Sequence, residues 1–440
     1  FWPKYDLDKA LPRYGLERIN EYVKVAKIPL EKIPPIFHIT GTNGKGSVTA
    51  FLKYILEANN YLVHRFTSPH IVDWNERIEI SSKIITDDYA NQCANECKNI
   101  VDENNLQLSY FEGMFAIALN AFLKEPATAT IIEVGMGGRY DATNVIDRSL
   151  ASIITYISLD HCKTLGETEE LIAIEKAEII KQNGITIVAK QKKQSVIDII
   201  VKTAKERNNK IYIYGVDFFS EKIDGGFVFN GFGKTLKLPL PNLIGEHQID
   251  NATAAIAALL SQSRIKISDD SVAKGLKNAH WLGRLQNLSN SKLSKYLPKD
   301  AVFFIDGAHN DSGAKILKEW LELEKAKTKS ICERRNILIT SMLSRKNSGL
   351  FIENLDKCFD LVLTVCMSNE EKSKSPSDFK QEFIDNGWNN VVAIDGDFIE
   401  ALNYVKENLK GAVRVVISGS LHLVGEVLEI ERKMGGNIYQ

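Results

Sequence analysis

The segment GTNGKGS at residues 41–47 is the sequence feature that most constrains how this chain folds. It follows the apolar run Ile36–Ile39, and apolar residues recur at helical spacing directly after it, which predicts strand, turn and helix. Glycines let backbone N–H groups converge on an anion, while the helix N-terminus and Lys45 supply positive charge. The segment therefore predicts a phosphate-binding loop, in which Ser47 can place its hydroxyl on a magnesium ion. Gly46, between Lys45 and Ser47, departs from the strict nucleotide-binding pattern GxxxxGK(S/T).

Composition indicates an ordinary globular enzyme of two or three domains. The chain has 440 residues, of which 44% are hydrophobic and 25% charged, and its formal net charge is −1. This balance gives no general affinity for nucleic acid or anionic membranes. No apolar run approaches about 18 residues, the start does not resemble a signal peptide, and the six cysteines include no CxxC pair. We therefore expect a cytoplasmic protein with reduced cysteines and no zinc site.

Three further segments are predicted to lie beside the phosphate loop, at the carboxyl edge of one parallel sheet. They are TSPH at 67–70, Glu133 at the end of an apolar strand, and Asp160–His161 after the strand 152–157. That edge is where open α/β sheets bind their ligands. Taken alone, Glu133 is explained equally well as a solvated residue at a strand end, because a buried carboxylate needs a partner or a metal. Together these features favour a magnesium site, which His161 suits less well than the oxygen ligands do.

The remainder of the first half contains weaker signals. A helical region is expected over 87–123, with SYFE (109–112) in its middle, and a β-hairpin is expected at 227–232. Lys176 lies on a predicted helix, where the residues alone indicate a solvated side chain. Asn251, on a later helix, could recognise a nucleotide base through its amide, although packing explains most of that helix.

The second half alternates strands and helices, which predicts a mainly parallel sheet after a hinge at WLGRLQ (281–286). We expect its strands near 302–305, 336–341, 360–365, 391–394 and 413–418. The predicted fold class is therefore α/β, in two domains. Residues 1–282 form a P-loop ATPase-like doubly wound sheet domain with a small antiparallel β addition, and residues 283–440 form a Rossmann-like α/β domain.

Over nearly its whole length the chain closely resembles the folylpolyglutamate synthase and dihydrofolate synthase family of the Mur-ligase superfamily. The motifs that carry this resemblance are GTNGKGS (41–47), TSPH (67–70), ERI (76–78), SYFE (109–112), EVGMGGRYDATN (133–144), LDH (159–161), EKAEIIK (175–181), GRLQ (283–286), DGAHN (306–310) and SGSLHLVGE (418–426). The resemblance implies an ATP-dependent ligase that adds L-glutamate to dihydropteroate and to reduced folates. The reaction would pass through an acyl phosphate and release ADP and phosphate.

The resemblance also implies roles for individual residues. The expected catalytic residues are Lys45, Lys176 and His309. The expected ATP contacts are Asn43, Gly44, Lys45, Gly46, Ser47, Asn251, Arg284 and Asp306. The expected pteroate contacts are Ser109, Tyr110, Phe111, Tyr140, Asp141 and Ala142. Ser68, Glu133 and His161 would hold magnesium, with two ions typical of the family, and Lys176 matches a lysine that can be carbamylated.

Several alternatives remain open. Arg139 in GGRYDATN is similar to the bifunctional bacterial form, and a monofunctional folylpolyglutamate synthase is the alternative. Glu178 stands where the family often has glycine, which we interpret as a surface change. A Mur-type cell-wall ligase would need a domain of about a hundred residues before the loop, and residues 1–40 are too few. A non-catalytic regulator would lack the catalytic-edge residues, and a kinase would not need DGAHN. We expect a monomer with small-molecule substrates and no nucleic-acid or membrane partner.

Overall fold

The computed structural model describes residues 2–3, 15–328, 334–344, 346, 348–368 and 373–439. The chain divides into two compact units, one formed by residues 1–242 with 248–279 and the other by residues 243–247 with 280–440. No pattern in the sequence indicated that segment 243–247 belongs with the second unit, and the domain boundary after residue 282 stays a prediction. Five cysteines are free thiols, and Cys332 lies outside the described residues.

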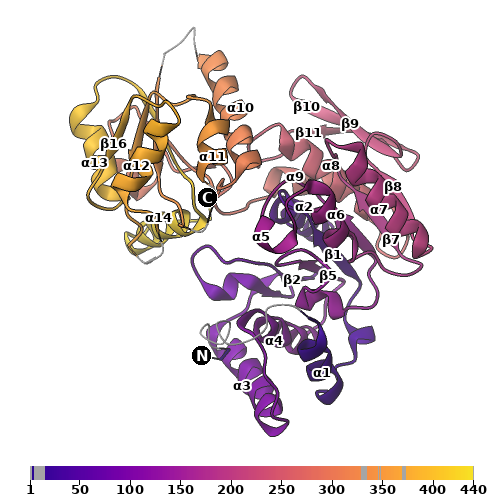
Figure 1. Ribbon diagram of the computed structural model, residues 1–440. Helices are drawn as coiled ribbons and strands as arrows, with labels where there is room; N and C mark the ends of the chain where they lie inside the picture. Colours follow the sequence, from indigo (N-terminus) through magenta and orange to yellow (C-terminus); the bar gives the residue numbers. More distant parts are fainter. Residues whose placement is uncertain are drawn as a thin grey trace. The chain divides into compact units, whose positions relative to one another are not determined.

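The first unit contains an eight-stranded sheet in the order β4-β3-β2-β5-β1-β6-β7-β8 (Figure 1). Its strands are β1 (Ile36–Thr40), β2 (Val63–Phe66), β3 (Ile78–Ile80), β4 (Lys83–Ile84), β5 (Ala129–Glu133), β6 (Ala151–Ile154), β7 (Ile185–Val188) and β8 (Lys210–Ile213). Neighbours from β2 to β8 are parallel, whereas β3 and β4 add antiparallel strands at one edge. Every residue of β1 and β5 is buried, as expected for central strands covered on both faces.

The helices of the first unit differ from the prediction in two places. They are α1 (Glu17–Val25), η2 (Leu30–Lys32), α2 (Lys45–Ala58), η3 (Trp74–Arg77), α3 (Asp87–Glu103), α4 (Tyr110–Lys124), η4 (Ala142–Val145), α5 (Cys162–Leu165), α6 (Glu169–Ala177), α7 (Gln194–Glu206), α8 (His247–Leu260) and α9 (Asp269–Asn278). The single helical region expected over 87–123 is two helices, because Ser109 caps a new one instead of lying in the middle of a long one. The helix that carries Lys176 ends at Ala177, so Glu178 lies at its C-cap.

A three-stranded antiparallel sheet forms the predicted β addition. Its strands are β9 (Phe218–Ile223), β10 (Gly226–Gly231) and β11 (Lys234–Pro239), with β10 in the centre. The hairpin predicted within 227–232 is therefore wrong in detail, since most of that run is one strand. The turns lie on either side of it, where Gly225 and Gly233 have φ values of +70° and +71° that favour glycine.

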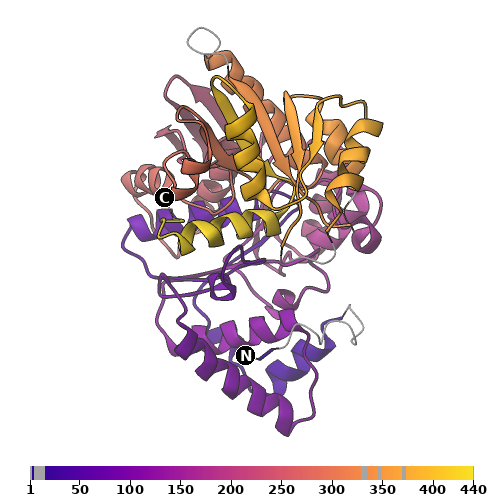
Figure 2. The ribbon, with the colours of Figure 1, turned by 90° about the vertical axis from the view of Figure 1, so that its left-hand side faces the viewer.

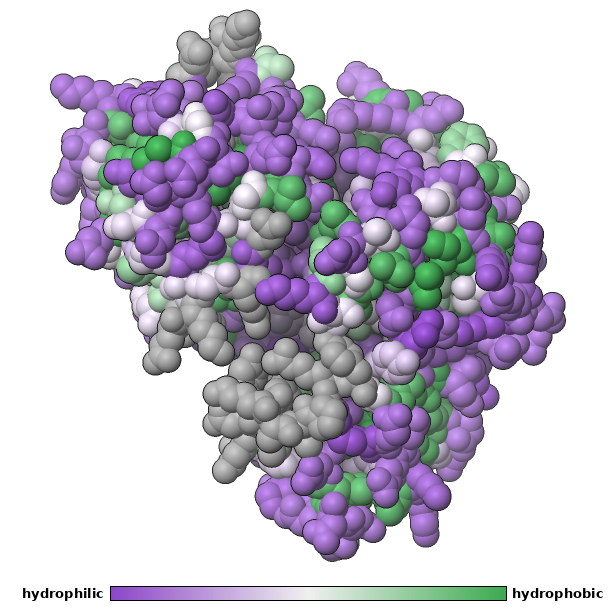
Figure 3. Space-filling view, viewed as in Figure 1, coloured by the Kyte–Doolittle hydropathy of each residue, from purple (hydrophilic) through white to green (hydrophobic). Residues whose placement is uncertain are grey.

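The second unit has a six-stranded sheet in the order β12-β13-β17-β14-β15-β16, with helices on both sides (Figure 2). Its elements are β12 (Gln286–Asn287), η5 (Lys292–Tyr296), β13 (Val302–Ile305), α10 (Asp311–Thr328), β14 (Arg335–Thr340), α11 (Ser348–Leu355), β15 (Leu361–Thr364), α12 (Pro376–Asp385), β16 (Val391–Ala393), α13 (Phe398–Asn408), β17 (Val413–Ser418) and α14 (Leu421–Lys433). All five predicted strands are confirmed, and only the short β12 is antiparallel. The face visible in Figure 3 is mostly hydrophilic. Within the described ranges, no helix has the length and apolar character needed to cross a membrane.

Candidate active site

The glycine-rich loop joins the buried strand β1 to helix α2, as the sequence predicted. Gly41 has a φ of +148°, and a Cβ placed on it would lie 1.8 Å from Thr155 Oγ1, so a larger residue does not fit. Gly44 has a φ of +90°, and its Cβ position is 2.5 Å from Asn251 Oδ1. Two backbone N–H groups of the loop donate to the carbonyl oxygen of Tyr156, just beyond β6. The fold thus fixes the loop and brings the distant Asn251 against it.

Two lysine side chains donate to one carbonyl oxygen of this loop. Lys45 Nζ lies 3.0 Å from the oxygen of Gly41 and 3.3 Å from that of Thr42, and Lys176 Nζ lies 2.8 Å from the oxygen of Gly41. Burial of Lys176, reinforced by the charge of Lys45, lowers the Lys176 pKa to about 7, although nearby aspartates act in the opposite direction. Near neutral pH a large fraction of Lys176 is therefore uncharged, which is the nucleophilic form of an amine.

Parallel strand pairing brings the predicted oxygen ligands to the same edge. Ile39 pairs with Glu133, and Phe66 pairs with Ile132, so Ser68 follows a strand end adjacent to Glu133. Glu133 is only 5% exposed. Carboxylate and hydroxyl oxygens fit magnesium, which usually retains water and binds substrate phosphates. In the described part of the chain, no three His, Cys, Asp or Glu side chains form a group that could hold a metal ion.

His161 lies on a loop beyond the sheet. The strand expected to run to 157 ends at Ile154, and the chain then continues beside the phosphate loop through a bridge between Tyr156 and Asn43. His161 has a left-handed φ of 52°, its side chain is 48% exposed, and its Nε2 lies 3.8 Å from Asp160 Oδ2. Its assignment as a metal ligand stays a prediction.

Gly135 lies between the two predicted pteroate-contacting segments, because its Cβ position is close to both Phe111 and the Asp141 carboxylate. The Phe111 ring packs 5.6 Å from that of Phe66, and a Cβ on Gly135 would lie 2.7 Å from Phe111 Cζ. Ser109 forms a reciprocal helix cap, since its N–H donates to the Glu112 carboxylate at 2.7 Å and its Oγ accepts from the Glu112 N–H at 3.3 Å. This cap begins the helix and so sets the position of the Phe111 ring.

Asp141 stabilises the segment 140–142 through hydrogen bonds to neighbouring residues. Its carboxylate accepts from the backbone N–H of Met136 and from both the N–H and the hydroxyl of Thr143. Burial raises the pKa of Asp141, while these hydrogen bonds lower it. His38 Nε2 lies 2.9 Å from Thr143 Oγ1 and donates to it, because that hydroxyl donates to Asp141. The neighbouring Tyr140 is 50% exposed, so its ring is accessible to a ligand.

A group of charged residues joins this segment to the end of α6. Arg139 pairs with Glu175 and Glu178 at 3.3 Å each, and Arg207 pairs with Glu178 and donates to its carbonyl oxygen at 2.9 Å. We call these four residues the α6 clamp. Gly138 packs beside it, with its Cβ position 2.7 Å from the Glu175 carbonyl oxygen. Glu178 is thus partly buried and paired with two arginines, which is more than the surface change we expected.

In the second unit, the predicted residues gather at the carboxyl edge of the sheet. Asp306 accepts two backbone N–H bonds at 2.8 Å; burial raises its pKa, while Arg284 lowers it. A Cβ on Gly307 would lie 2.7 Å from a terminal nitrogen of Arg284. His309 Nδ1 lies 2.7 Å from the Gly307 carbonyl oxygen, so Nδ1 carries a proton that it donates to this oxygen.

The structure adds residues that sequence reasoning missed. His247, in the segment 243–247, has its pKa lowered to about 4 by burial and by Arg284, so it is neutral at physiological pH. Thr155 donates to the Asn43 carbonyl oxygen at 2.7 Å and holds the phosphate loop. Glu76 accepts three successive backbone N–H groups after the TSPH turn. The only sequence signal for Thr155 was its place as a polar residue just past an apolar strand. The sequence around His247 gave no signal that it would be a site residue.

The sequence is similar to ligases along both units. The family model for the Mur ligase middle domain matches residues 39–259, and that for the dihydrofolate synthetase C-terminal domain matches residues 289–430. A dihydrofolate synthase/folylpolyglutamate synthase from Bacillus subtilis is 31% identical over 428 residues, which cover 94% of each chain.

The fold is similar to solved structures over nearly the full length. Escherichia coli FolC in complex with DHPP and ADP is 26% identical with a TM-score of 0.83, covering 98% of this chain and 96% of that one. A bifunctional folylpolyglutamate synthase/dihydrofolate synthase from Yersinia pestis, complexed with AMPPNP and a manganese ion, is 25% identical with a TM-score of 0.82, covering 96% and 95%. The predicted α/β fold class is confirmed.

Proposed function

Because the chain belongs to the dihydrofolate synthase/folylpolyglutamate synthase family of ATP-dependent ligases, we propose that it joins L-glutamate to dihydropteroate and to reduced folates. The observation that carries the proposal is the phosphate loop with Lys45 and Lys176 on one carbonyl oxygen, next to the strand end that holds Glu133. That arrangement combines phosphate binding with an amine that is close to neutral. The E. coli relative, which binds DHPP and ADP, supports both a pteroate-type substrate and a nucleotide.

The chemistry requires activation of a carboxylate, which is a poor electrophile because its leaving group would be oxide. In the proposed reaction a carboxylate oxygen attacks the γ-phosphorus of ATP, the bond to ADP breaks, and an acyl phosphate forms. The glutamate amine then attacks the acyl carbon, loses a proton, and expels phosphate with its electron pair. We assign phosphate binding to Asn43, Gly44, Lys45, Gly46 and Ser47, whose N–H groups and positive charge would stabilise the transferring group.

Further roles are proposed for residues in each of the two units. We assign Asn251, Arg284 and Asp306 to ATP and His309 to catalysis. Ser109, Tyr110, Phe111, Tyr140, Asp141 and Ala142 are assigned to the pteroate end. Apolar rings around Phe111 suit a flat heterocycle, and the exposed Tyr140 ring adds a second aromatic surface.

We propose that Ser68, Glu133 and His161 hold magnesium, with two ions in the complete site. The manganese ion and AMPPNP in the Y. pestis relative support a divalent cation beside the nucleotide. The cation would neutralise charge on the phosphates. Replacing Glu133 by Gln should raise the magnesium concentration needed for half-maximal turnover, and an unchanged magnesium titration would remove Glu133 from the metal site.

Lys176 is proposed to carry a carbamate in the active enzyme. Its pKa of about 7 leaves neutral amine that can attack carbon dioxide and release a proton. The carbamate would carry a negative charge in place of an ammonium that would repel the proposed magnesium ion. Carbon-13 NMR with labelled bicarbonate should show a carbamate carbon in the wild type and none in Lys176→Arg. A signal that persists in the variant would assign the carbamate elsewhere.

Phosphate release with ATP, magnesium and glutamate tests the proposed function, with dihydropteroate and tetrahydrofolate supplied separately. Turnover with both acceptors is the expected result. Turnover with dihydropteroate alone would restrict the enzyme to dihydrofolate synthesis, which the matched C-terminal family model would suit. Turnover with tetrahydrofolate alone would make it a polyglutamate synthase. No turnover with either, in a folded protein that binds ATP, would overturn the proposal. We also propose a cytoplasmic monomer, which mass measurement during size-exclusion chromatography tests in part.

A further inference from the structure

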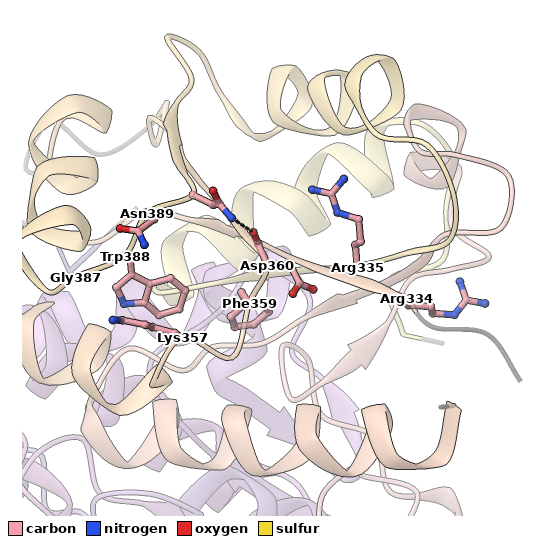
Figure 4. A pocket seen from close by; sticks show the side chains of 9 residues that line it. Arg334, Arg335, Lys357, Phe359, Asp360, Gly387, Trp388 and Asn389 are labelled. Atoms are coloured by element: carbon pink, nitrogen blue, oxygen red, sulfur yellow. Dashed lines mark hydrogen bonds between the residues drawn. The ribbon is translucent and has the colours of Figure 1, made fainter. Parts of the chain in front are cut away.

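A cavity lies in the C-terminal unit (Figure 4). It is at the opposite end of the sheet from Asp306. Its volume is about 400 Å³. Residues at the starts of three strands line it, because β14 begins at Arg335, Asp360 precedes β15 and Asn390 precedes β16. Asp306 instead follows the carboxyl end of β13 in the same sheet. A strand of six residues spans about 20 Å, so the two ends of the sheet are separate environments.

The wall of this cavity is held rigidly from behind. The Asp360 carboxylate accepts from the backbone N–H of Asn336 at 2.7 Å, and the Asp360 carbonyl oxygen accepts from Asn390 Nδ2 at 3.2 Å. Asn336 Oδ1 accepts in turn from Arg414 at 2.9 Å, and Arg414 is 2% exposed. Asp360, the single acidic residue in the lining, is therefore engaged in hydrogen bonds within the wall. The Trp388 indole, 5% exposed and packed edge-on against Phe383, forms an apolar part of the floor.

Three cations surround this wall. Arg334 donates to the carbonyl oxygen of Asp300, which holds its side chain without neutralising its charge. Lys357 lies close enough to the neighbouring Asp356 to help lower the pKa of that carboxylate, whose main partner is Lys318. The Lys357 ammonium lies 3.1 Å from the Cβ position of Gly387, whose φ of +77° also favours glycine. The loop thus leaves room for this lysine beside Trp388, as Figure 4 shows.

We propose that this cavity is a binding site for a small polyanion carrying phosphate or several carboxylates. Three positive side chains and one carboxylate leave a net positive lining, and arginine pairs with phosphate and carboxylate through parallel hydrogen bonds. The volume suits a small molecule and is too small for a macromolecular surface. The small exposed part of the Trp388 indole would lie beside the bound molecule.

Calorimetric titration of the full chain with pyrophosphate and, separately, with citrate tests this proposal. Excess ADP and magnesium are included so that the phosphate loop is occupied. The double variant Arg335→Glu/Lys357→Glu reverses two charges in the lining. Lys202→Glu/Lys274→Glu is the matched control, because it makes the same charge change at two exposed lysines outside the cavity. Tryptophan fluorescence, compared with Trp388→Phe, reports whether binding occurs at the floor.

The expected result is saturable binding of one equivalent of at least one probe. That binding should weaken at least tenfold in Arg335→Glu/Lys357→Glu and persist in the lysine control. Binding of pyrophosphate alone would assign the site to phosphate compounds, and binding of citrate alone would assign it to polycarboxylates. The proposal is overturned if neither probe saturates at millimolar concentration. It is also overturned if the cavity variant and the control bind equally well.

Discussion

At the scale of single residues, the Gly41 carbonyl oxygen is the centre of the candidate site. Lys45 and Lys176 both donate to it, so two ammonium groups compete for one acceptor in a buried place. Lys176 is the more deeply buried of the two, and this burial, together with the charge of Lys45, lowers its pKa to about 7. The Lys176 amine therefore becomes available for chemistry near neutral pH.

The lowered pKa of Lys176 predicts a pH-dependent cost to stability. The folded pKa of about 7 is below the ordinary lysine value of 10.5, so the unfolded state binds more protons between these pH values and stability rises with pH. Lys176→Met should thus be more stable than the wild type below pH 7, with an advantage that shrinks towards pH 10. Thermal melts in metal-free, bicarbonate-free buffer measure this difference. A difference that stays constant from pH 6 to 10 would show that Lys176 has an ordinary pKa.

Lys45→Ala should remove activity and leave the fold intact. Loss of a charge that stabilises the transferring phosphate costs about 10²–10³-fold in turnover. The melting temperature should change little, because the side chain bonds only to loop carbonyl oxygens. The stabilisation by ADP and magnesium should shrink as well. Lys163→Ala, an exposed lysine on α5, is the control. Wild-type turnover in Lys45→Ala would remove this lysine from the mechanism.

At the scale of elements, helix α9 supports the helix that begins at the phosphate loop. A Cβ on Gly275 in α9 would lie 2.5 Å from the Ile55 Cα in α2, so the two backbones touch. Glycine in a helix interior normally costs about 1 kcal/mol relative to alanine. Here close packing outweighs that preference.

The sign of the effect of Gly275→Ala tests this contact. Helix propensity alone would stabilise the protein, whereas overpacking should lower the free energy of unfolding by about 1–3 kcal/mol. We expect a lower free energy of unfolding. We also expect a raised KM for ATP, because a shift of α2 would move the phosphate loop. Urea denaturation and steady-state kinetics measure the two effects. A stabilised variant with unchanged KM would mean that the helices are less closely packed.

The α6 clamp should act on pteroate binding through the segment that follows β5. Glu178→Gln weakens both arginine contacts, so the KM for dihydropteroate should rise several-fold while the KM for ATP stays within twofold. Glu167→Gln, at an exposed position before α6, controls for the lost charge. Equal changes in both KM values would indicate a general loss of structure and contradict a specific positioning role.

At the scale of the whole molecule, the sequence predicted the order of strands and helices better than it predicted which segments pack together. The strands of the second unit were found because continuous Val and Ile runs mark buried parallel strands, as in Val413–Ser418. The break between α3 and α4 was missed because residues 104–108 contain neither glycine nor proline. The segment 243–247 joins the second unit through tertiary packing, which leaves no local pattern.

The candidate site shows the same division. Strand order placed Glu133 and Ser68 beside the loop, whereas Lys176 was singled out only by the resemblance to the family. The contact of Lys176 with Gly41 and the hydrogen bond from His38 to Thr143 each join residues far apart in the sequence. Local sequence carries no information about such contacts, so only the structure could reveal them.

Transfer of oxygen from substrate to phosphate tests the central claim most directly. Dihydropteroate labelled with oxygen-18 in its carboxylate would be turned over with ATP, magnesium and glutamate, and the released phosphate analysed by mass spectrometry. An acyl phosphate requires one labelled oxygen to leave with each phosphate, because the attacking carboxylate oxygen stays on phosphorus. We predict one label per phosphate released. Unlabelled phosphate, with both labels retained in unreacted dihydropteroate, would show that ATP is hydrolysed without activating the carboxylate, and would contradict the account.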